Sequence, residues 1–317
     1  MTQYSFSDLG FPSQELEALE QLQAIKRSSQ EHLSSVFEAP EFGFALDLAS
    51  RSSSESRQFK HVHQMCQTHA IHFEKANQIK TTYILDSYLW AAAQLNPVAV
   101  YSAARSLLEL HAVLRYFEHR LSEACTGAEA EWRERGHRYF DLILRARYGT
   151  SDPKAQRILK MVGIPETALK PIRVGKARAF LTNELPWIDE HYALLCDFVH
   201  HNMSSQRTAG SLVGKSHMAR SSAGGGFLMA QQHPIVQYTF PAPDRGRHAV
   251  RDTATRALEN VRGVMDATNR FPRSPFTEAE LMAKTGSAIG FKPPSRNARC
   301  PCGSGKKYRN CHGAALA

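Results

Sequence analysis

The stretch that decides the fold is VAVYSAARSLLELHAVLRYFEHRL, which runs from Val98 to Leu121. It follows Asn96-Pro97, a pair that ends one helix and suits the start of the next. At about 3.6 residues per turn, its apolar positions fall in one stripe about 100° wide on a helical wheel. The pattern predicts a long amphipathic helix with one face in a core; the stripe holds Val100, Ala104, Leu107, His111, Leu114 and Leu121.

Similar spacing elsewhere predicts that most of the chain is helical. Gly163 and Pro165 close one short predicted helix, and Thr277 and Glu280 start another at the capping-box spacing. The prolines around Pro234 to Phe240 suit a single short edge strand. We therefore expect a mainly α protein, a multi-helix bundle with a short β element. Helices are predicted at 12–37, 59–95, 132–148, 154–162, 187–202 and 247–269.

Changes in composition predict five consecutive segments. Ser, Gly and Ala dominate from Thr208 to Gly226, which is typical of a mobile loop. Four prolines follow the last long helix and indicate a tether. The predicted segments are an N-terminal helical segment (1–50), a helical body (59–205), a loop with a short strand and a helix (206–269), the tether (270–295) and a C-terminal module (296–317).

Composition and charge limit the classes of protein to consider. The chain has 317 residues, and its most apolar window, Thr81 to Val100, is interrupted by Asp86, Gln94 and Pro97. No window reaches the roughly 18 apolar residues of a membrane span. The N-terminus has no secretion-signal pattern, so we expect a cytoplasmic protein without a membrane span. Residues 1–200 carry 22 basic and 24 acidic side chains, whereas residues 201–317 carry 17 and 6. The basic C-terminal third predicts an acidic partner.

Four potential metal ligands crowd into the C-terminal module. Cys300, Cys302, Cys311 and His312 surround a turn rich in glycine and lysine. Three thiolates and one imidazole can fill the tetrahedral shell that Zn²⁺ prefers, and a shell filled by protein is structural. Metal binding would supply the folding free energy that so short a segment lacks. The sequence therefore predicts a structural zinc site.

The same residues closely resemble the SEC-C motif, a zinc-binding tail at the C-terminus of the bacterial translocation ATPase SecA and of many other bacterial proteins. The resemblance covers about Arg296 to Gly313 and includes every zinc ligand. It implies a recruitment device, because in the translocation ATPase such a tail contacts a chaperone and the ribosome. The chain has no phosphate-binding Gly-x-x-x-x-Gly-Lys-Ser/Thr loop, so ATPase activity is not implied. The exposed basic face would hold Lys306, Lys307 and Arg309, with Tyr308 as a stacking platform.

The helical body resembles HEPN-type proteins, a group of RNA-cleaving toxins and phage-defence effectors that also has inactive members. The resemblance rests on Arg105 and Glu109 in one helix and on a later helix that ends in Asp197-Phe-Val-His200-His201-Asn202. Active members place an arginine four to six residues before a histidine, and none precedes His200 here at that spacing. Such an enzyme would use His200 or His201 as the general base, with Arg105 supplied by the facing helix.

Other histidines have simpler interpretations. His111 falls on the apolar stripe and is predicted to be a core residue. Cys66, His69 and His72 are three apart and could reach one metal from a helix, but we favour ordinary surface histidines. The full row comprises His61, His63, Cys66, His69 and His72.

These observations predict a bacterial, zinc-binding adaptor. Its helical body would form a homodimer or hold a partner, and its basic tail would recruit RNA or a chaperone- or ribosome-like protein. The alternative is a metal-independent, HEPN-like ribonuclease that uses the tail to find RNA.

Overall fold

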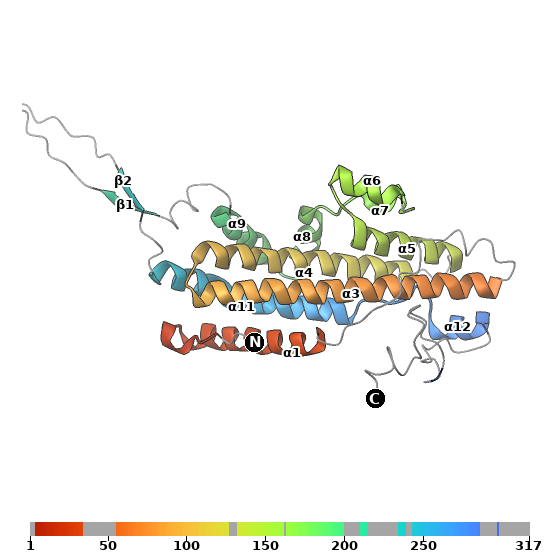
Figure 1. Ribbon diagram of the computed structural model, residues 1–317, viewed down its shortest axis with the longest axis horizontal. Coiled ribbons are helices and arrows are strands. Elements are labelled where there is room, and N and C mark those ends of the chain that lie inside the picture. Colours follow the sequence, from red (N-terminus) through yellow and green to blue (C-terminus); the bar gives the residue numbers. More distant parts are fainter. Residues whose placement is uncertain are drawn as a thin grey trace, which may run out of the picture. The chain divides into compact units, whose positions relative to one another are not determined.

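The computed structural model describes residues 4–33, 55–126, 132–161, 163–199, 210–214, 234–238 and 243–285, together with Asn297. Within these ranges the mainly helical class is confirmed (Figure 1). The elements are η1 (Ser7–Leu9), α1 (Ser13–Leu33), α3 (Glu55–Ala93), α4 (Pro97–Thr126), α5 (Trp132–Tyr148), α6 (Pro153–Met161), α7 (Glu166–Leu169), α8 (Val174–Thr182), α9 (Ile188–Val199), β1 (Gly210–Gly214), β2 (Pro234–Tyr238), α11 (Pro243–Asn269) and α12 (Glu278–Thr285).

The chain forms two compact units, each assembled from distant segments. The first combines Met1–Ala24, Ile84–Leu108 and Trp187–Asn260, and the second combines Ile25–Tyr83, Glu109–Pro186 and Val261–Ala317. Helices α1, α3, α4 and α11 contribute residues to both units. The five consecutive segments remain a prediction.

The turn between α3 and α4 has the geometry that Asn96-Pro97 predicted. The Asn96 N–H donates to the Ala91 carbonyl at 2.9 Å, and Leu95 takes a left-handed φ of 50°, which together end α3. The Asn96 side chain then accepts from the Ala99 N–H at 3.2 Å and caps α4. Helix α11 passes so close that a Cβ at Gly246 would lie 2.1 Å from the Leu95 carbonyl oxygen.

A buried tyrosine links two helices in the core of the first unit. Tyr88 on α3 is fully buried, and its hydroxyl lies 2.9 Å from Thr253 Oγ1 on α11. Thr253 gives its own proton to the Ala249 carbonyl, so Tyr88 is the donor. Because buried hydroxyls cost free energy without a partner, this pairing fixes α3 against α11.

Part of the predicted tether packs firmly on the second unit. Phe276 is buried, with its ring stacked 4.3 Å from that of Phe59, and Phe271 lies 5.1 Å from Phe73. Arg273 also pairs with Glu74 at 2.9 Å. The residues up to the end of α12 are therefore docked, and a tether stays a proposal only for the residues that follow.

Strands β1 and β2 pair antiparallel, with Leu212 opposite Val236. Strand β2 covers most of the predicted Pro234–Phe240 strand, whereas β1 lies in the predicted mobile loop, the rest of which is outside the described residues. In the described part of the chain, no helix combines the length and apolar character that crossing a membrane requires.

Candidate functional site

The predicted zinc ligands lie outside the described residues, as do the predicted contact residues of the tail. These are Cys300, Cys302, Cys311 and His312, and Lys306, Lys307, Tyr308 and Arg309. The fit of the metal is therefore tested on donor chemistry: three thiolates and an imidazole match the sulfur and nitrogen ligands of structural zinc. Together they leave no position for a water, so the zinc would organise this tail and take no part in a reaction.

Arg105 lies at the contact between α4 and α9. Its Nη2 donates to the Tyr192 hydroxyl at 3.2 Å, and its guanidinium carbon lies 5.3 Å from the centre of the Tyr192 ring. Both side chains are half-buried. Arg105 thus has a clear role in holding α9, and the expected pairing of this helix with α4 is present.

The last described turn of α9 is also held against α4. The rings of Phe198 and Tyr101 stack with centres 4.0 Å apart and planes 8° from parallel. The Tyr101 hydroxyl donates to Asp252 Oδ2 at 2.7 Å, and burial together with this carboxylate raises the pKa of the phenol. Asp197 is exposed, while His200 and His201 are outside the described residues.

The histidine row on α3 is more buried than expected. His63, Cys66 and His69 are all in the core of the second unit, so the interpretation of His63 and His69 as surface histidines is wrong. Aromatic residues that are distant in sequence, Phe140 and Phe276, cover this face of α3, which local spacing does not reveal. Burial lowers the pKa of His63 to about 4 and, with the Arg147 charge, that of His69 to about 3. In the described part of the chain, no three His, Cys, Asp or Glu side chains are grouped to hold a metal.

His111 is a core residue, as predicted. It is buried on α4, and a Cβ at Gly263 of α11 would lie 2.1 Å from its Nε2. The glycine therefore makes the space in which the imidazole packs.

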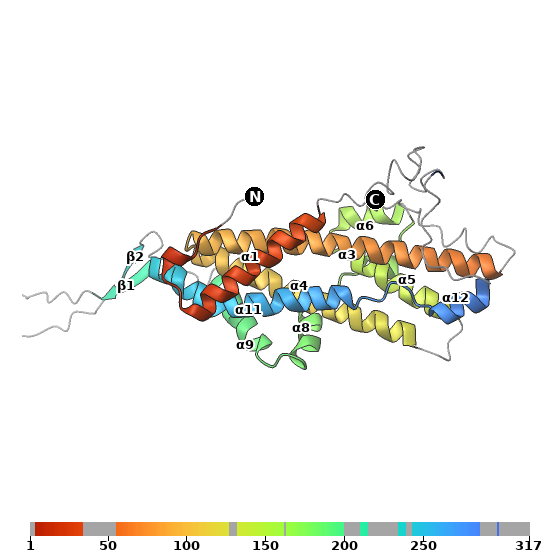
Figure 2. The same ribbon diagram turned by 90° about the horizontal axis from the view of Figure 1, so that it is seen from below.

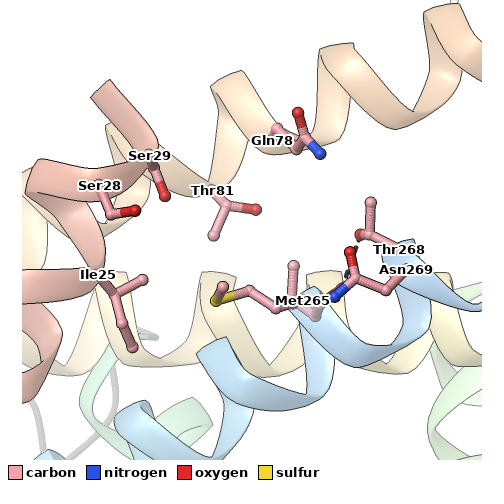
Figure 3. A pocket seen from close by; sticks show the side chains of 9 residues that line it. Ile25, Ser28, Ser29, Gln78, Thr81, Met265, Thr268 and Asn269 are labelled. Atoms are coloured by element: carbon pink, nitrogen blue, oxygen red, sulfur yellow. Dashed lines mark hydrogen bonds between the residues drawn. The ribbon is translucent and has the colours of Figure 1, made fainter. Parts of the chain in front are cut away.

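A pocket of about 230 Å³ opens in the second unit between side chains of α1, α3 and α11 (Figure 3). The Thr81 and Thr268 hydroxyls each donate to a carbonyl of their own helix at 2.7 Å, which leaves their oxygens as acceptors. None of the lining residues titrates near neutral pH, so the pocket could bind a neutral polar molecule but offers no acid–base chemistry. The lining comprises Ile25, Ser28, Ser29, Gln78, Thr81, Val264, Met265, Thr268 and Asn269.

A wider hollow of about 530 Å³ lies in the first unit beside Trp90, whose side chain is 49% exposed. Small residues of α4 line it, including Ser102 and Ser106, and Tyr4 donates to Asp86 at 3.1 Å along its edge. Sequence reasoning missed this site. The signal was a tryptophan on α3 opposite small α4 positions, but only the fold shows that they meet.

Comparison with known proteins defines the C-terminal module. Residues 296–314 match the family model of the SEC-C motif. Motifs of this kind are usually zinc-binding. The protein is thus a mainly helical chain that carries a SEC-C motif.

Its curated relatives include the protein translocase subunit SecA of several bacteria. The SecA of Sulfurovum sp. (strain NBC37-1) is 38% identical over 79 residues, which are 25% of this chain and 9% of that protein. The SecA of Anaplasma marginale (strain St. Maries) is 32% identical over 88 residues, 27% of this chain and 9% of the relative. The SecA of Pelodictyon phaeoclathratiforme (strain DSM 5477 / BU-1) is 73% identical over 26 residues, 8% of this chain and 2% of the relative. The chain therefore spans less than a tenth of the length of these relatives, and no solved structure matches it.

Proposed function

We propose that this protein is a cytoplasmic adaptor that uses its SEC-C tail to recruit a partner. The observation that carries the proposal is the SEC-C match at residues 296–314, with a complete set of three cysteines and one histidine inside it. Zinc held by Cys300, Cys302, Cys311 and His312 would fold the tail, because so short a segment cannot bury a core of its own.

The charge of the tail supports an anionic partner. Lys306, Lys307 and Arg309 follow one another around Tyr308, and no acidic side chain lies between Arg296 and Ala317. Such a face would attract RNA or an acidic protein surface of the chaperone or ribosome type, with Tyr308 available for stacking.

Metal content tests the first step. The purified chain should carry one zinc ion by elemental analysis, and Cys311→Ser should lose it. Cys196→Ser is the matched control, because Cys196 is a free cysteine on α9. A Cys311→Ser protein that keeps its zinc would exclude the proposed ligand set.

Recruitment needs a separate test on the intact chain. RNA and protein retained by the full chain should be compared with those retained by a chain truncated after Pro294. Loss of one defined partner on truncation supports recruitment by the tail. Retention of the same partner would mean that the helical body makes the contact. The hollow beside the half-exposed Trp90 would then be tested first, with Trp90→Ala.

One observation supports a second candidate function, that of a ribonuclease. Because Arg105 bonds Tyr192 and Tyr101 stacks on Phe198, the helix that precedes His200 and His201 packs on the helix that carries Arg105. A HEPN-like ribonuclease would cleave RNA without added metal, using one of these histidines as base and Arg105 to hold the phosphate. His200→Ala and His201→Ala should each be compared with wild type, with His137→Ala as an exposed control. Cleavage that survives both changes, alone and combined, would remove the histidine base.

A further inference from the structure

Helix α6 is specified by strong local signals at both ends. The Asp152 carboxylate accepts from the Lys154 N–H at 2.9 Å, and Pro153 occupies the first helical position. At the other end, Gly163 has a φ of 87°, and the Ile164 N–H donates to the Leu159 carbonyl at 3.0 Å. This is a Schellman motif, which stops the helix sharply. The sequence thus builds a complete helix at a defined place.

This helix buries none of its residues. Most helices in globular proteins owe their stability to an apolar face packed on a core, so the exposed apolar side chains of α6 lack such a partner within the described chain. Ile158 is 62% exposed and Met161 is 80% exposed. Side chains this exposed project from a surface and do not line a groove.

Cations share the outward stripe with these apolar side chains. At 100° per residue, Lys154, Arg157, Ile158 and Met161 fall within about 100° of one another on the helix. All four are exposed. Around the helix the order is Arg157, Met161, Lys154 and Ile158, so two apolar side chains alternate with two positive charges.

The sequence in and after α6 is strongly basic. Residues 151–178 contain seven Lys and Arg residues against Asp152 and Glu166 alone. Glu166 pairs with Lys160 at 3.1 Å. Among the described residues, no acidic side chain pairs with Lys154, Arg157, Lys170 or Arg173. A count over residues 1–200 conceals this cluster, because acidic residues elsewhere balance it.

We propose that α6 docks on an anionic lipid surface, with Ile158 and Met161 inserted below the headgroups and the neighbouring cations at the phosphate level. A helix lying in the interface satisfies both kinds of side chain at once, because apolar chains lie directly beneath negative headgroups. Figure 1 shows α6 and α7 together beside α5 at the outside of the ribbon.

Other occupants fit these residues less well. A second copy would bring two positive clusters together, which is repulsive. A nucleic acid would contact the cations but leave Ile158 and Met161 in water. A partner helix needs a concave groove, and these side chains project.

Flotation of the full chain with lipid vesicles tests the proposal. The protein should float with vesicles of equal parts phosphatidylcholine and phosphatidylglycerol, but not with phosphatidylcholine alone. Ile158→Ser combined with Met161→Ser should weaken binding about a hundredfold, since each buried apolar side chain contributes roughly tenfold in affinity. Ile79→Ser combined with Val98→Ser is the matched control, because these residues are 42% and 44% exposed on other helices.

A second pair of variants tests the charges, with vesicle binding measured at two salt concentrations. Lys154→Glu with Arg157→Glu should weaken binding about tenfold and reduce its salt dependence, whereas Lys60→Glu with Lys80→Glu on α3 should change little. All variants keep the SEC-C tail, so attraction through the tail is common to every sample. Unchanged flotation of the Ile158–Met161 variant would overturn the proposal, and so would equal binding to neutral vesicles. Loss with the charge variant alone would also overturn it, because the vesicles would then attract the cations without insertion of the apolar side chains.

Discussion

Helices α6 and α12 start in the same way but differ in their surroundings: α12 packs on a core and α6 is exposed. They have 9 and 8 residues, and each starts with a side-chain cap, Asp152 for α6 and Thr277 for α12. Around α12, Leu281 and the preceding Phe276 are buried, and Glu280 pairs with the buried Arg135 of α5. Figure 2 shows α12 beside the first turns of α3, whereas α6 buries nothing.

The difference teaches that local signals and packing are separate pieces of information. A cap and a stop signal decide where a short helix forms, but they do not decide what covers it. In α12 the chain itself covers the apolar face. In α6 that face is left exposed, and this is why we assign it a surface outside the chain.

The largest expected effect is at the docked helix. Phe276→Ala should lower the free energy of unfolding by about 3–5 kcal/mol, because a buried ring stacked on Phe59 is replaced by a cavity. Met161→Ala should stay within about 0.5 kcal/mol of wild type, because its side chain is exposed. Denaturant titrations of both variants measure the contrast. Comparable losses would mean that α6 is held by its own chain after all.

The next largest effect is expected at low pH, which should lower the free energy of unfolding through a histidine packed next to α12. His63 Nδ1 lies 2.7 Å from Ser274 Oγ, just before α12, and burial lowers its pKa to about 4 from the ordinary value near 6.5. The unfolded chain therefore binds the proton more tightly, and stability is complete above about pH 6.5 and falls as the pH drops towards 4. The loss is about 1.4 kcal/mol per pH unit for each such histidine, and His69 adds to it.

Unfolding measured at pH 7 and pH 5 checks this dependence. His63→Gln should remove one histidine's share of the slope, while His137→Gln, an exposed change on α5, should leave the slope as it is. An unchanged slope in His63→Gln would show that this histidine does not become protonated on unfolding.

A smaller effect is expected when alanine replaces a crowded glycine near α12 or an uncrowded glycine on α8. A Cβ at Gly136 on α5 would lie 2.8 Å from Val62 Cγ1 and 3.3 Å from Phe276 Cζ, at the seat of α12. Gly136→Ala should destabilise the protein by about 1–2 kcal/mol in a thermal melt, since overpacking exceeds the helix-propensity gain of about 1 kcal/mol. Gly175→Ala on α8 meets nothing within 4 Å and should be neutral or slightly stabilising. Equal melting temperatures for the two variants would mean that Val62 and Phe276 do not pack against Gly136.

Sequence patterns predicted the elements with strong ends and missed those without them. The Thr277 capping box is confirmed, with Glu280 Oε2 accepting from the Thr277 N–H at 2.9 Å. Helices α7 and α8 were missed, because Pro165 and Arg173 precede them without a capping side chain. Nothing local shows that Phe276 reaches Phe59, more than two hundred residues earlier, so the burial of the α3 histidines could not be predicted. The zinc ligands are the opposite case: their chemistry is contained within one short motif, and they remain a prediction from it.

The smallest expected effect separates local from global stability. Thr277→Ala and Asp152→Ala each remove a helix cap that contributes about 1 kcal/mol to its helix. For Thr277→Ala the loss should appear in the global free energy of unfolding, because α12 is coupled to the core through Glu280 and Arg135. For Asp152→Ala the global value should stay unchanged, because opening α6 exposes no buried side chain. Hydrogen exchange should instead show faster exchange confined to α6. Global destabilisation by Asp152→Ala would mean that α6 supports the fold, and its exposed stripe would then need no external surface to explain it.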